Sequence, residues 1–322
     1  MRRSRRRRVV KVAHPRLASH IAAVIVTHDR LAALSRCVDA VCAQTFPVSE
    51  IVVVDNASTD GTGEWTDAQP DVTAIHQGDE GSAGGMYTGI AYAMDVGADA
   101  MWMLDDDALP EATALERLVN AKANDGTNVV GSLIVSMEDP EILSFEVPKV
   151  SSYNRLFDYY RKLTDRVEDL RAESDERGYP WSMFTNSILL SRHVVEKVGL
   201  PKREFYMGGE EVEYHYRVRS HGYGTFLVLD SICRHPKRPA AAAPAWKQKS
   251  LVRNTVYIHR RYRRWFVLRT LRRLLLFLVT GRFAFVAALW DGVREDYSKR
   301  YIEAPGAREQ TQSRAAGSSS SQ

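Results

Sequence analysis

With 322 residues, 44% of them hydrophobic and 26% charged, the chain has the composition of a globular protein, as one large α/β domain with appendages or as two domains. The formal net charge of +4 hides a segregation: residues 1–17 hold eight basic and no acidic side chains, and residues 231–290 hold fourteen and again no acid. The rest holds 22 basic and 40 acidic side chains, so an acidic body carries basic segments that suit an anionic partner, either membrane headgroups or nucleic acid. Three cysteines fit neither a disulfide framework nor a metal-binding spacing, which favours a cytoplasmic location.

The first third of the chain alternates between strand and helix patterns. It begins with "MRRSRRRR", which lacks the apolar stretch and cleavage site of a secretory signal, and we expect a disordered basic arm over residues 1–18. Short apolar runs of strand length follow at 21–26, 51–54, 73–76 and 101–104. The segments between them, two with helical apolar spacing, are 30–44, 61–68 and 84–97.

This alternation predicts a mostly parallel sheet with helices on both faces, an α/β fold. In open sheets of this kind, ligands bind beyond the carboxyl ends of the strands. The polar clusters "THDR", "DNASTDGT" and "DDDALP" each follow a predicted strand directly. We therefore expect one crevice to collect all three.

Further along, strands are predicted at 128–135, 186–191 and 225–231, and a helix at 210–223 with a glycine stop at Gly222. Residues 151–180 are polar and aromatic, and we interpret them as a mobile insertion with some helix. The low-complexity end of the chain predicts a disordered tail over 304–322.

Residues 271–290 form the most apolar window, "LRRLLLFLVTGRFAFVAALW". Its three arginines argue against a membrane-spanning helix. Their interleaving with apolar residues is typical of an interfacial helix, although a core-packing helix with a solvated basic face would give the same pattern. We interpret residues 237–303 as a basic amphipathic helical region that associates with the inner face of the cell membrane.

Asp105, Asp106 and Asp107 follow the strand "MWML". Adjacent carboxylates raise one another's pKa unless a cation neutralises them. Two carboxylates together with phosphate oxygens are a usual Mg²⁺ or Mn²⁺ site in nucleotide enzymes. The alternative is a solvated acidic turn, but two further strand-end polar clusters favour metal binding.

Two other segments point to a nucleotide. Asp55 stands at a strand end, where it could accept a hydrogen bond from a base or ribose, or simply belong to an ordinary strand-to-helix turn. The glycine-rich stretch "GDEGSAGGMYTG" runs into a helix, so its backbone amides could approach a diphosphate. It has neither the dinucleotide-binding nor the P-loop spacing.

The motifs taken together resemble those of inverting family 2 glycosyltransferases with a GT-A fold. They are "VIVTHDR", "IVVVDNASTDGT", "GSAGG", "MLDDDALP", "MGGEEVEYHYRVRSHGY" and "RHP", in the family's order between Ala22 and Pro236. Within that family the similarity is greatest to bacterial galactofuranosyl- and rhamnosyltransferases that extend lipid-linked cell-wall glycans. A glycosyltransferase domain over residues 19–236 is therefore expected.

The resemblance implies roles for residues that bind the sugar-nucleotide donor. Thr27, Arg30 and Asp55 match positions that contact the nucleoside, and Gly84 and Gly85 match a loop that faces the donor.

The resemblance also implies a metal site. The triplet matches the family's DXD motif, with Asp106 near the ribose and Asp105 and Asp107 at the metal. His235 matches a further metal ligand, although Arg234 stands where the family usually has tryptophan, and a structural histidine is the alternative.

An inverting transfer needs a base for the acceptor hydroxyl and a cation for the departing diphosphate. We assign Glu211 as the base and Glu210 as the second choice, because both begin a helix whose N-terminal dipole would keep a carboxylate ionised. The alternative is an ordinary acidic first turn of an amphipathic helix. Trp181 could stack on a sugar or pack in the core.

The sequence therefore predicts a metal-dependent enzyme that transfers galactofuranose from UDP-galactofuranose to a polyprenyl-linked cell-wall saccharide. A rhamnosyltransferase using dTDP-rhamnose is the first alternative. A nucleotidyltransferase would need a glycine-rich phosphate loop after the first strand, and "VIVTHDRLAAL" has no glycine. A nucleic-acid-binding protein would explain the arginine-rich arm, but the acidic body would repel nucleic acid.

Overall fold

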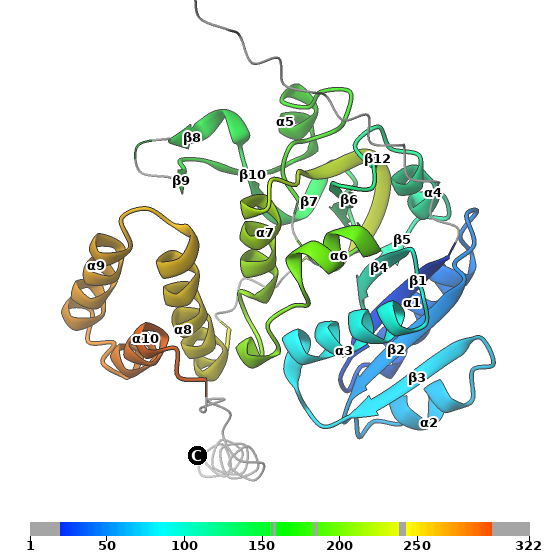
Figure 1. The fold of residues 1–322 in the computed structure, drawn as a ribbon, viewed down its shortest axis with the longest axis horizontal. Helices are drawn as coiled ribbons and strands as arrows, with labels where there is room; N and C mark the ends of the chain where they lie inside the picture. The colour runs from blue at the N-terminus through cyan, green and yellow to red at the C-terminus, as the bar shows by residue number, and fades with distance from the viewer. Residues whose placement is uncertain are drawn as a thin grey trace, which may run out of the picture.

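A computed structural model describes residues 20–154, 156, 159–182, 184, 186–237 and 243–297. The basic arm predicted at 1–18 and the tail predicted at 304–322 lie outside the described residues. Figure 1 shows a central sheet flanked by helices, with a further helical group formed by the C-terminal segment.

The strands in chain order are β1 (Ile21–Thr27), β2 (Glu50–Asn56), β3 (Val72–Gln77), β4 (Ala100–Asp105), β5 (Leu109–Pro110), β6 (Val129–Ser136), β7 (Ile142–Pro148), β8 (Tyr153–Asn154), β9 (Tyr159–Tyr160), β10 (Leu163–Arg166), β11 (Ile188–Ser191) and β12 (Thr225–His235). The helices are α1 (Leu31–Cys42), α2 (Thr62–Asp67), α3 (Gly81–Asp95), α4 (Ala114–Val119), α5 (Val167–Ala172), α6 (Arg192–Val198), α7 (Glu210–Ser220), α8 (Ala245–Tyr262), α9 (Phe266–Val279) and α10 (Ala284–Arg294). Two 3₁₀ turns, η1 (Val150–Ser152) and η2 (Arg203–Phe205), complete the set.

The main sheet has the strand order β10-β7-β6-β11-β4-β1-β2-β3, with β12 beside β6 and β5 beside β12. The four strands predicted first are parallel to one another, β1 lying between β4 and β2, whereas β11 runs antiparallel to β4 and β6. The predicted α/β class is confirmed. The register sets Thr27 opposite Asp55 and Val26 opposite Asp105, so the polar segments after β1, β2 and β4 meet at one edge.

Each face of the sheet carries a separate apolar core. On one face Trp102 and alternate residues of β1 and β2 pack against α1 and α4. On the other face Met101 and Met103 pack against α3, α6 and α7. Because β1 and β2 are apolar on both faces, they read as continuous hydrophobic runs, as expected of strands in a buried parallel sheet.

The segment 151–180 is largely built from defined elements. It contains the β8–β9 hairpin, the helix α5 and the strand β10, which pairs antiparallel with β7. The predicted helix content is present, and β10 extends the main sheet by one strand.

The C-terminal segment forms the three helices α8, α9 and α10, which lie together beside α7 (Figure 1). Helix α8 buries Arg253, Asn254 and Ile258 against the segment that precedes α7. The packing therefore continues across residue 236, where the sequence analysis ended the glycosyltransferase domain.

Candidate active site

The acidic triplet lies at the end of β4, facing the loop that follows β1. Thr27 donates from Oγ1 to Asp106 Oδ2 at 2.9 Å. One nitrogen of Arg30, Nη1, donates to Asp106 Oδ1 at 2.8 Å and to Asp107 Oδ2 at 2.7 Å. The guanidinium group of Arg30 therefore supplies positive charge to two of the three carboxylates from within the chain.

Asp105, Asp107 and His235 come together as a possible metal site. Each offers one ligand atom, and these atoms all lie within 4.8 Å of one another. His235 donates from Nδ1 to the carbonyl of Pro236 at 2.6 Å, because a carbonyl can only accept. Its Nε2 lies 2.9 Å from Asp107 Oδ1, so a proton or a metal ion must stand between these two acceptor atoms. The ring of His235 packs against Phe145 at a centroid distance of 4.7 Å.

The surroundings of Asp105 and Asp107 shift the pKa values of these two carboxyl groups in opposite directions. Burial, with the neighbouring charges of Asp107 and Asp106, raises the pKa of Asp105 to about 7. Burial also opposes the charged form of Asp107, but the hydrogen bond and charge of His235 and the charge of Arg30 outweigh it and lower its pKa to about 2. Two carboxylates and an imidazole nitrogen are a donor set suited to Mn²⁺, and with phosphate oxygens to Mg²⁺.

Asp55, Gly84 and Gly85, which were expected to contact the sugar-nucleotide donor, make contacts within the protein. Asp55 accepts from the Ser58 amide at 3.0 Å and lies 3.2 Å from Nδ1 of His76, so it stabilises the turn after β2. Helix α3 begins at Gly81, so Gly84 and Gly85 lie in a helix rather than the expected loop. A Cβ on Gly85 would stand 2.3 Å from Val26, which shows that this glycine allows α3 to pack closely on β1.

Glu210 and Glu211 are the first residues of α7, after Gly209 in the left-handed conformation. Glu210 is buried and accepts a hydrogen bond from the Ser82 hydroxyl of α3. Burial, then the charge of Glu211, raises the pKa of Glu210 to about 8. The expectation that the helix dipole keeps this carboxylate ionised is wrong for Glu210, because desolvation outweighs the dipole.

Glu211 remains within electrostatic reach of the metal site. After burial, Asp107, Asp106 and His235, its charge also contributes to the pKa of Asp105. One oxygen of Glu211 is buried and has no hydrogen-bond partner among the described residues, and the same holds for one oxygen of Glu210. Arg234, at the position where tryptophan was expected, instead pairs with Glu111 through Nη2 at 2.9 Å.

The sequence analysis missed the contribution of α8 to this site. Asn254 donates from Nδ2 to the carbonyls of Gly208 at 2.7 Å and Phe205 at 3.1 Å, and Arg253 donates to the same Phe205 carbonyl at 3.1 Å. The loop before α7 is thus held from the C-terminal segment. A buried arginine and asparagine in a predicted surface helix would have been hard to recognise, since their neighbours "SLVRNTVYIH" read as a basic amphipathic pattern.

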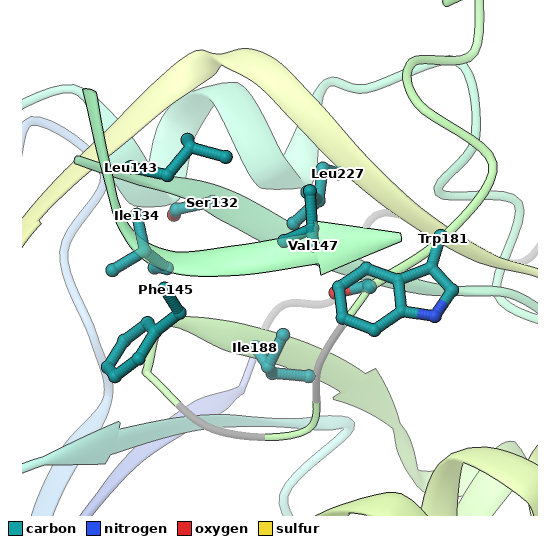
Figure 2. Close-up of a pocket in the computed structure, with 9 residues that line it drawn as sticks. Ser132, Ile134, Leu143, Phe145, Val147, Trp181, Ile188 and Leu227 are labelled. Atoms are coloured by element: carbon teal, nitrogen blue, oxygen red, sulfur yellow. The ribbon is translucent and has the colours of Figure 1, made fainter. Parts of the chain in front are cut away.

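Trp181 lies between two cavities. Figure 2 shows the smaller one, about 20 Å³, lined mainly by apolar side chains with Phe145 and Trp181 on opposite sides of the view. The larger one, about 290 Å³, has Trp181, His215 and Arg219 among its lining residues. The side chain of Trp181 is partly buried and packs against the apolar cluster of Leu133, Val135 and Tyr179, so the core-packing alternative holds at the margin of that cluster, and stacking on a sugar stays a prediction.

Known proteins are similar to this chain in sequence and in fold. A family model described as glycosyl transferase family 2 matches residues 22–173. The galactofuranosyltransferase GlfT1 of Mycolicibacterium smegmatis is 30% identical over 224 residues, a match covering 67% of this chain and 70% of that relative.

Two solved structures have a similar fold. A crystal structure of GalNAc-T7 with UDP, GalNAc and Mn²⁺ matches with a TM-score of 0.58 and 18% identity, over 75% of this chain and 48% of that one. The mannosyltransferase PcManGT of Pyrobaculum calidifontis, in complex with GDP-Man and Mn²⁺, matches with a TM-score of 0.50 and 17% identity, over 92% of this chain and 79% of that one. The chain therefore belongs to glycosyl transferase family 2 and is a glycosyltransferase of GT-A fold, as its motifs predicted.

Proposed function

We propose that this glycosyltransferase moves galactofuranose, with inversion, from UDP-galactofuranose to a saccharide carried on a polyprenyl lipid. The main support is that Asp105, Asp107 and His235 come together at the carboxyl edge of the sheet. They lie beside Asp106, which accepts hydrogen bonds from Thr27 and Arg30. The galactofuranosyltransferase relative supports the choice of sugar.

In this proposal Asp105, Asp107 and His235 hold a divalent cation, Mn²⁺ or Mg²⁺. The fit rests on the donor set and on Nε2 of His235, which faces a carboxylate oxygen at 2.9 Å. When bound, the cation would supply positive charge to the departing diphosphate. Arg30 adds a second positive charge there, and Asp106, held by Thr27, is placed to accept from the ribose.

Glu211 is the proposed base. The acceptor hydroxyl oxygen forms a bond to the anomeric carbon, the bond from that carbon to the diphosphate oxygen breaks, and the hydroxyl proton passes to Glu211. Glu210 is unsuited to this role at neutral pH, because burial raises its pKa to about 8 and it stays protonated. We assign Glu210 to positioning, through its hydrogen bond from Ser82.

We also propose that α9 docks the enzyme on an anionic membrane surface, where a lipid-linked acceptor would be found. Apolar side chains exposed by half or more lie along α9 and just after it, namely Val267, Leu268, Leu271, Leu275, Leu276, Val279 and Phe283. Exposed arginines 264, 272 and 282 accompany them, and the segment 231–290 has no acid. Such a surface complements anionic headgroups. Within the described residues, no helix has the length and apolarity that crossing a bilayer requires.

The experiment that tests the enzymatic proposal is a comparison of sugar nucleotides in the presence and absence of Mn²⁺. We expect UDP with Mn²⁺ to raise the melting temperature, and UDP-galactofuranose to support transfer onto membrane lipid extracts. Asp107→Asn should remove the effect of Mn²⁺, whereas Asp125→Asn, in a surface turn, should not. Transfer from dTDP-rhamnose alone would identify the alternative donor, and stabilisation by neither nucleotide would reject the proposed site.

A further inference from the structure

The larger cavity lies outside the donor site just described. It has a volume of about 290 Å³, near the lower end for small-molecule sites. Its lining comes from η1, the β8–β9 hairpin, the segment before β11, α7 and the residue after α8, and comprises Val150, Tyr153, Tyr160, Pro180, Trp181, His215, Tyr216, Arg219 and Arg263.

The lining combines positive charge with aromatic rings. Arg219 and Arg263 line the cavity, and no acidic side chain is among its described lining residues. The guanidinium of Arg219 is exposed and forms no hydrogen bond or ion pair with another described residue, whereas Arg263 lies over the ring of Tyr216. Guanidinium groups bind phosphate, and aromatic rings pack on the apolar faces of sugars. The cavity is therefore suited to a phosphate-bearing saccharide.

His215 adds a neutral hydrogen-bond acceptor to the same wall. Its Nδ1 lies 2.9 Å from the carbonyl of Ser182, so Nδ1 carries the proton and Nε2 is left as an acceptor. Burial, then the charges of Arg219 and Arg263, lowers the pKa of His215 to about 4, so the ring is neutral at physiological pH. A neutral imidazole can accept from a sugar hydroxyl, and the guanidinium groups on the same wall can donate to phosphate.

Elements that line the cavity also carry the candidate base and contact the start of the apolar helix. His215 lies one turn after Glu211 on α7, and Trp181 also lines the small cavity that reaches Phe145 beside His235. On the other side, Trp265 donates from Nε1 to the carbonyl of Leu156 at 3.0 Å, which ties the start of α9 to the hairpin. A ligand in the cavity would thus have the reacting groups on one side and the proposed lipid-facing helix on the other.

We infer that this cavity binds the phosphate-bearing end of the lipid-linked saccharide acceptor, with phosphate at Arg219 and Arg263 and a sugar ring against Trp181. The inference rests on the proposed function, since it presupposes an acceptor attached to a polyprenyl phosphate or diphosphate. It adds a binding site that is separate from the metal and nucleotide residues.

The test uses farnesyl diphosphate as the probe and the full-length enzyme with its donor site saturated by UDP and Mn²⁺. Arg219→Gln should raise the Kd of farnesyl diphosphate about tenfold, because a charge-assisted hydrogen bond is lost. Arg219→Lys should recover part of the affinity. Arg117→Gln, which changes an exposed arginine on α4, is the matched control and should have no effect. Farnesol, which has no phosphate, should bind wild type and Arg219→Gln alike.

The outcomes separate the two proposals. If wild type binds UDP with Mn²⁺ but Arg219→Gln leaves the affinity for farnesyl diphosphate unchanged, the acceptor site is wrong and the donor site stands. If Arg219→Gln weakens UDP binding as much as farnesyl diphosphate binding, the cavity belongs to the donor. If wild type fails to bind UDP with Mn²⁺ at all, the proposed function fails first.

Discussion

At the scale of single residues, the two glutamates that begin α7 have different environments. Glu210 is buried and accepts a hydrogen bond from the Ser82 hydroxyl, and burial raises its pKa to about 8. Glu211 is partly exposed, whereas each of the two glutamates has one buried oxygen without a partner among the described residues. Neighbouring carboxylates whose environments differ in this way can take different roles in one site.

Glu211→Gln is expected to lower the transfer rate by a factor of about 10²–10⁴, the usual contribution of a general base. UDP binding with Mn²⁺ should change little, because Glu211 is not among the contacts of the triplet. The measurements are turnover and the nucleotide-induced thermal shift. Glu210→Gln is the matched comparison and should retain more activity, since its carboxyl group is already protonated; equal losses in both variants would contradict the assignment.

His215 gives a prediction about pH. Its pKa is lowered to about 4 in the folded protein, chiefly by burial, whereas an unfolded histidine titrates near its ordinary value of 6.5. Between these values the unfolded chain binds the extra proton, so stability is complete above pH 6.5 and is lost as the pH falls towards 4. The slope from this group should approach about 1.4 kcal/mol of unfolding free energy per pH unit.

The check is the free energy of unfolding in urea at several pH values between 4 and 7. His215→Asn can still donate to the Ser182 carbonyl but does not titrate, so its stability should fall less steeply with acid. His221→Asn, on the exposed end of α7, is the control. Parallel curves for wild type and His215→Asn would show that the ring does not stay neutral in the fold.

At the scale of elements, α8 acts on the site by holding the loop that leads into α7. Asn254 is fully buried, and its Nδ2 satisfies the carbonyls of Phe205 and Gly208. The loop needs such support because Tyr206 has φ 61°, a conformation that costs a non-glycine residue free energy. The conformation before Glu210 is therefore maintained by contacts from a distant part of the chain.

Asn254→Ala is predicted to lower the free energy of unfolding by about 1–3 kcal/mol, because the Gly208 carbonyl loses its donor and the Phe205 carbonyl keeps only Arg253. Transfer should fall more than UDP affinity, since the loop precedes the proposed base. Thr255→Ala is the matched control, as its hydroxyl donates only to Leu251 within the same helix. A loss of stability with an unchanged transfer rate would restrict Asn254 to a structural role.

The sequence pattern predicted some elements well because the local signal and the final packing agree there. Strands β1, β2 and β4 are short apolar runs with turn residues after them, and they are buried on both faces of the sheet. Strands β7 and β10 were missed because "ILSFEVP" and "LTDR" mix polar and apolar residues, as strands toward an antiparallel edge do. Strand β12 runs past the predicted end, through a register shift between Val228 and Ile232.

The candidate site was predictable to the extent that its residues stand next to strands. Asp105 to Asp107 follow β4 directly, and parallel pairing brings them to Thr27. His235 reaches the site only because β12 pairs with β6 up to its last residue, and no local sequence pattern predicts that pairing. Asn254 and Arg219 depend on helix packing, so sequence spacing gave no signal for either.

At the scale of the whole molecule, charge and apolar surface are segregated together. The acidic body holds the sheet, and the basic C-terminal segment holds α9 with its exposed leucines. In the described part of the segment beyond residue 236, α8 packs against the rest of the protein, whereas α9 exposes apolar side chains to solvent. A membrane surface would cover only the second of these.

Replacing arginines 264, 272 and 282 by glutamine should weaken binding to anionic vesicles about 100-fold, at roughly 1 kcal/mol per basic residue near the surface. Leu271→Ser with Leu275→Ser should weaken it as well. The assay is sedimentation with phosphatidylglycerol vesicles, and Leu163→Ser on β10 is the control for an exposed leucine. Unchanged binding would reject membrane docking, and concentration-dependent dimers lost in the leucine variant would identify a second copy as the partner.

The inward packing of α8 has a practical consequence for anyone shortening this chain. A truncation after Pro236 would remove the basic segment with its exposed apolar surface. It would also delete Arg253 and Asn254, which donate hydrogen bonds to the carbonyls of Phe205 and Gly208. Apolar surface is better reduced by exchanging exposed leucines of α9 for polar residues, because that leaves the hydrogen bonds from α8 to the loop before α7 in place.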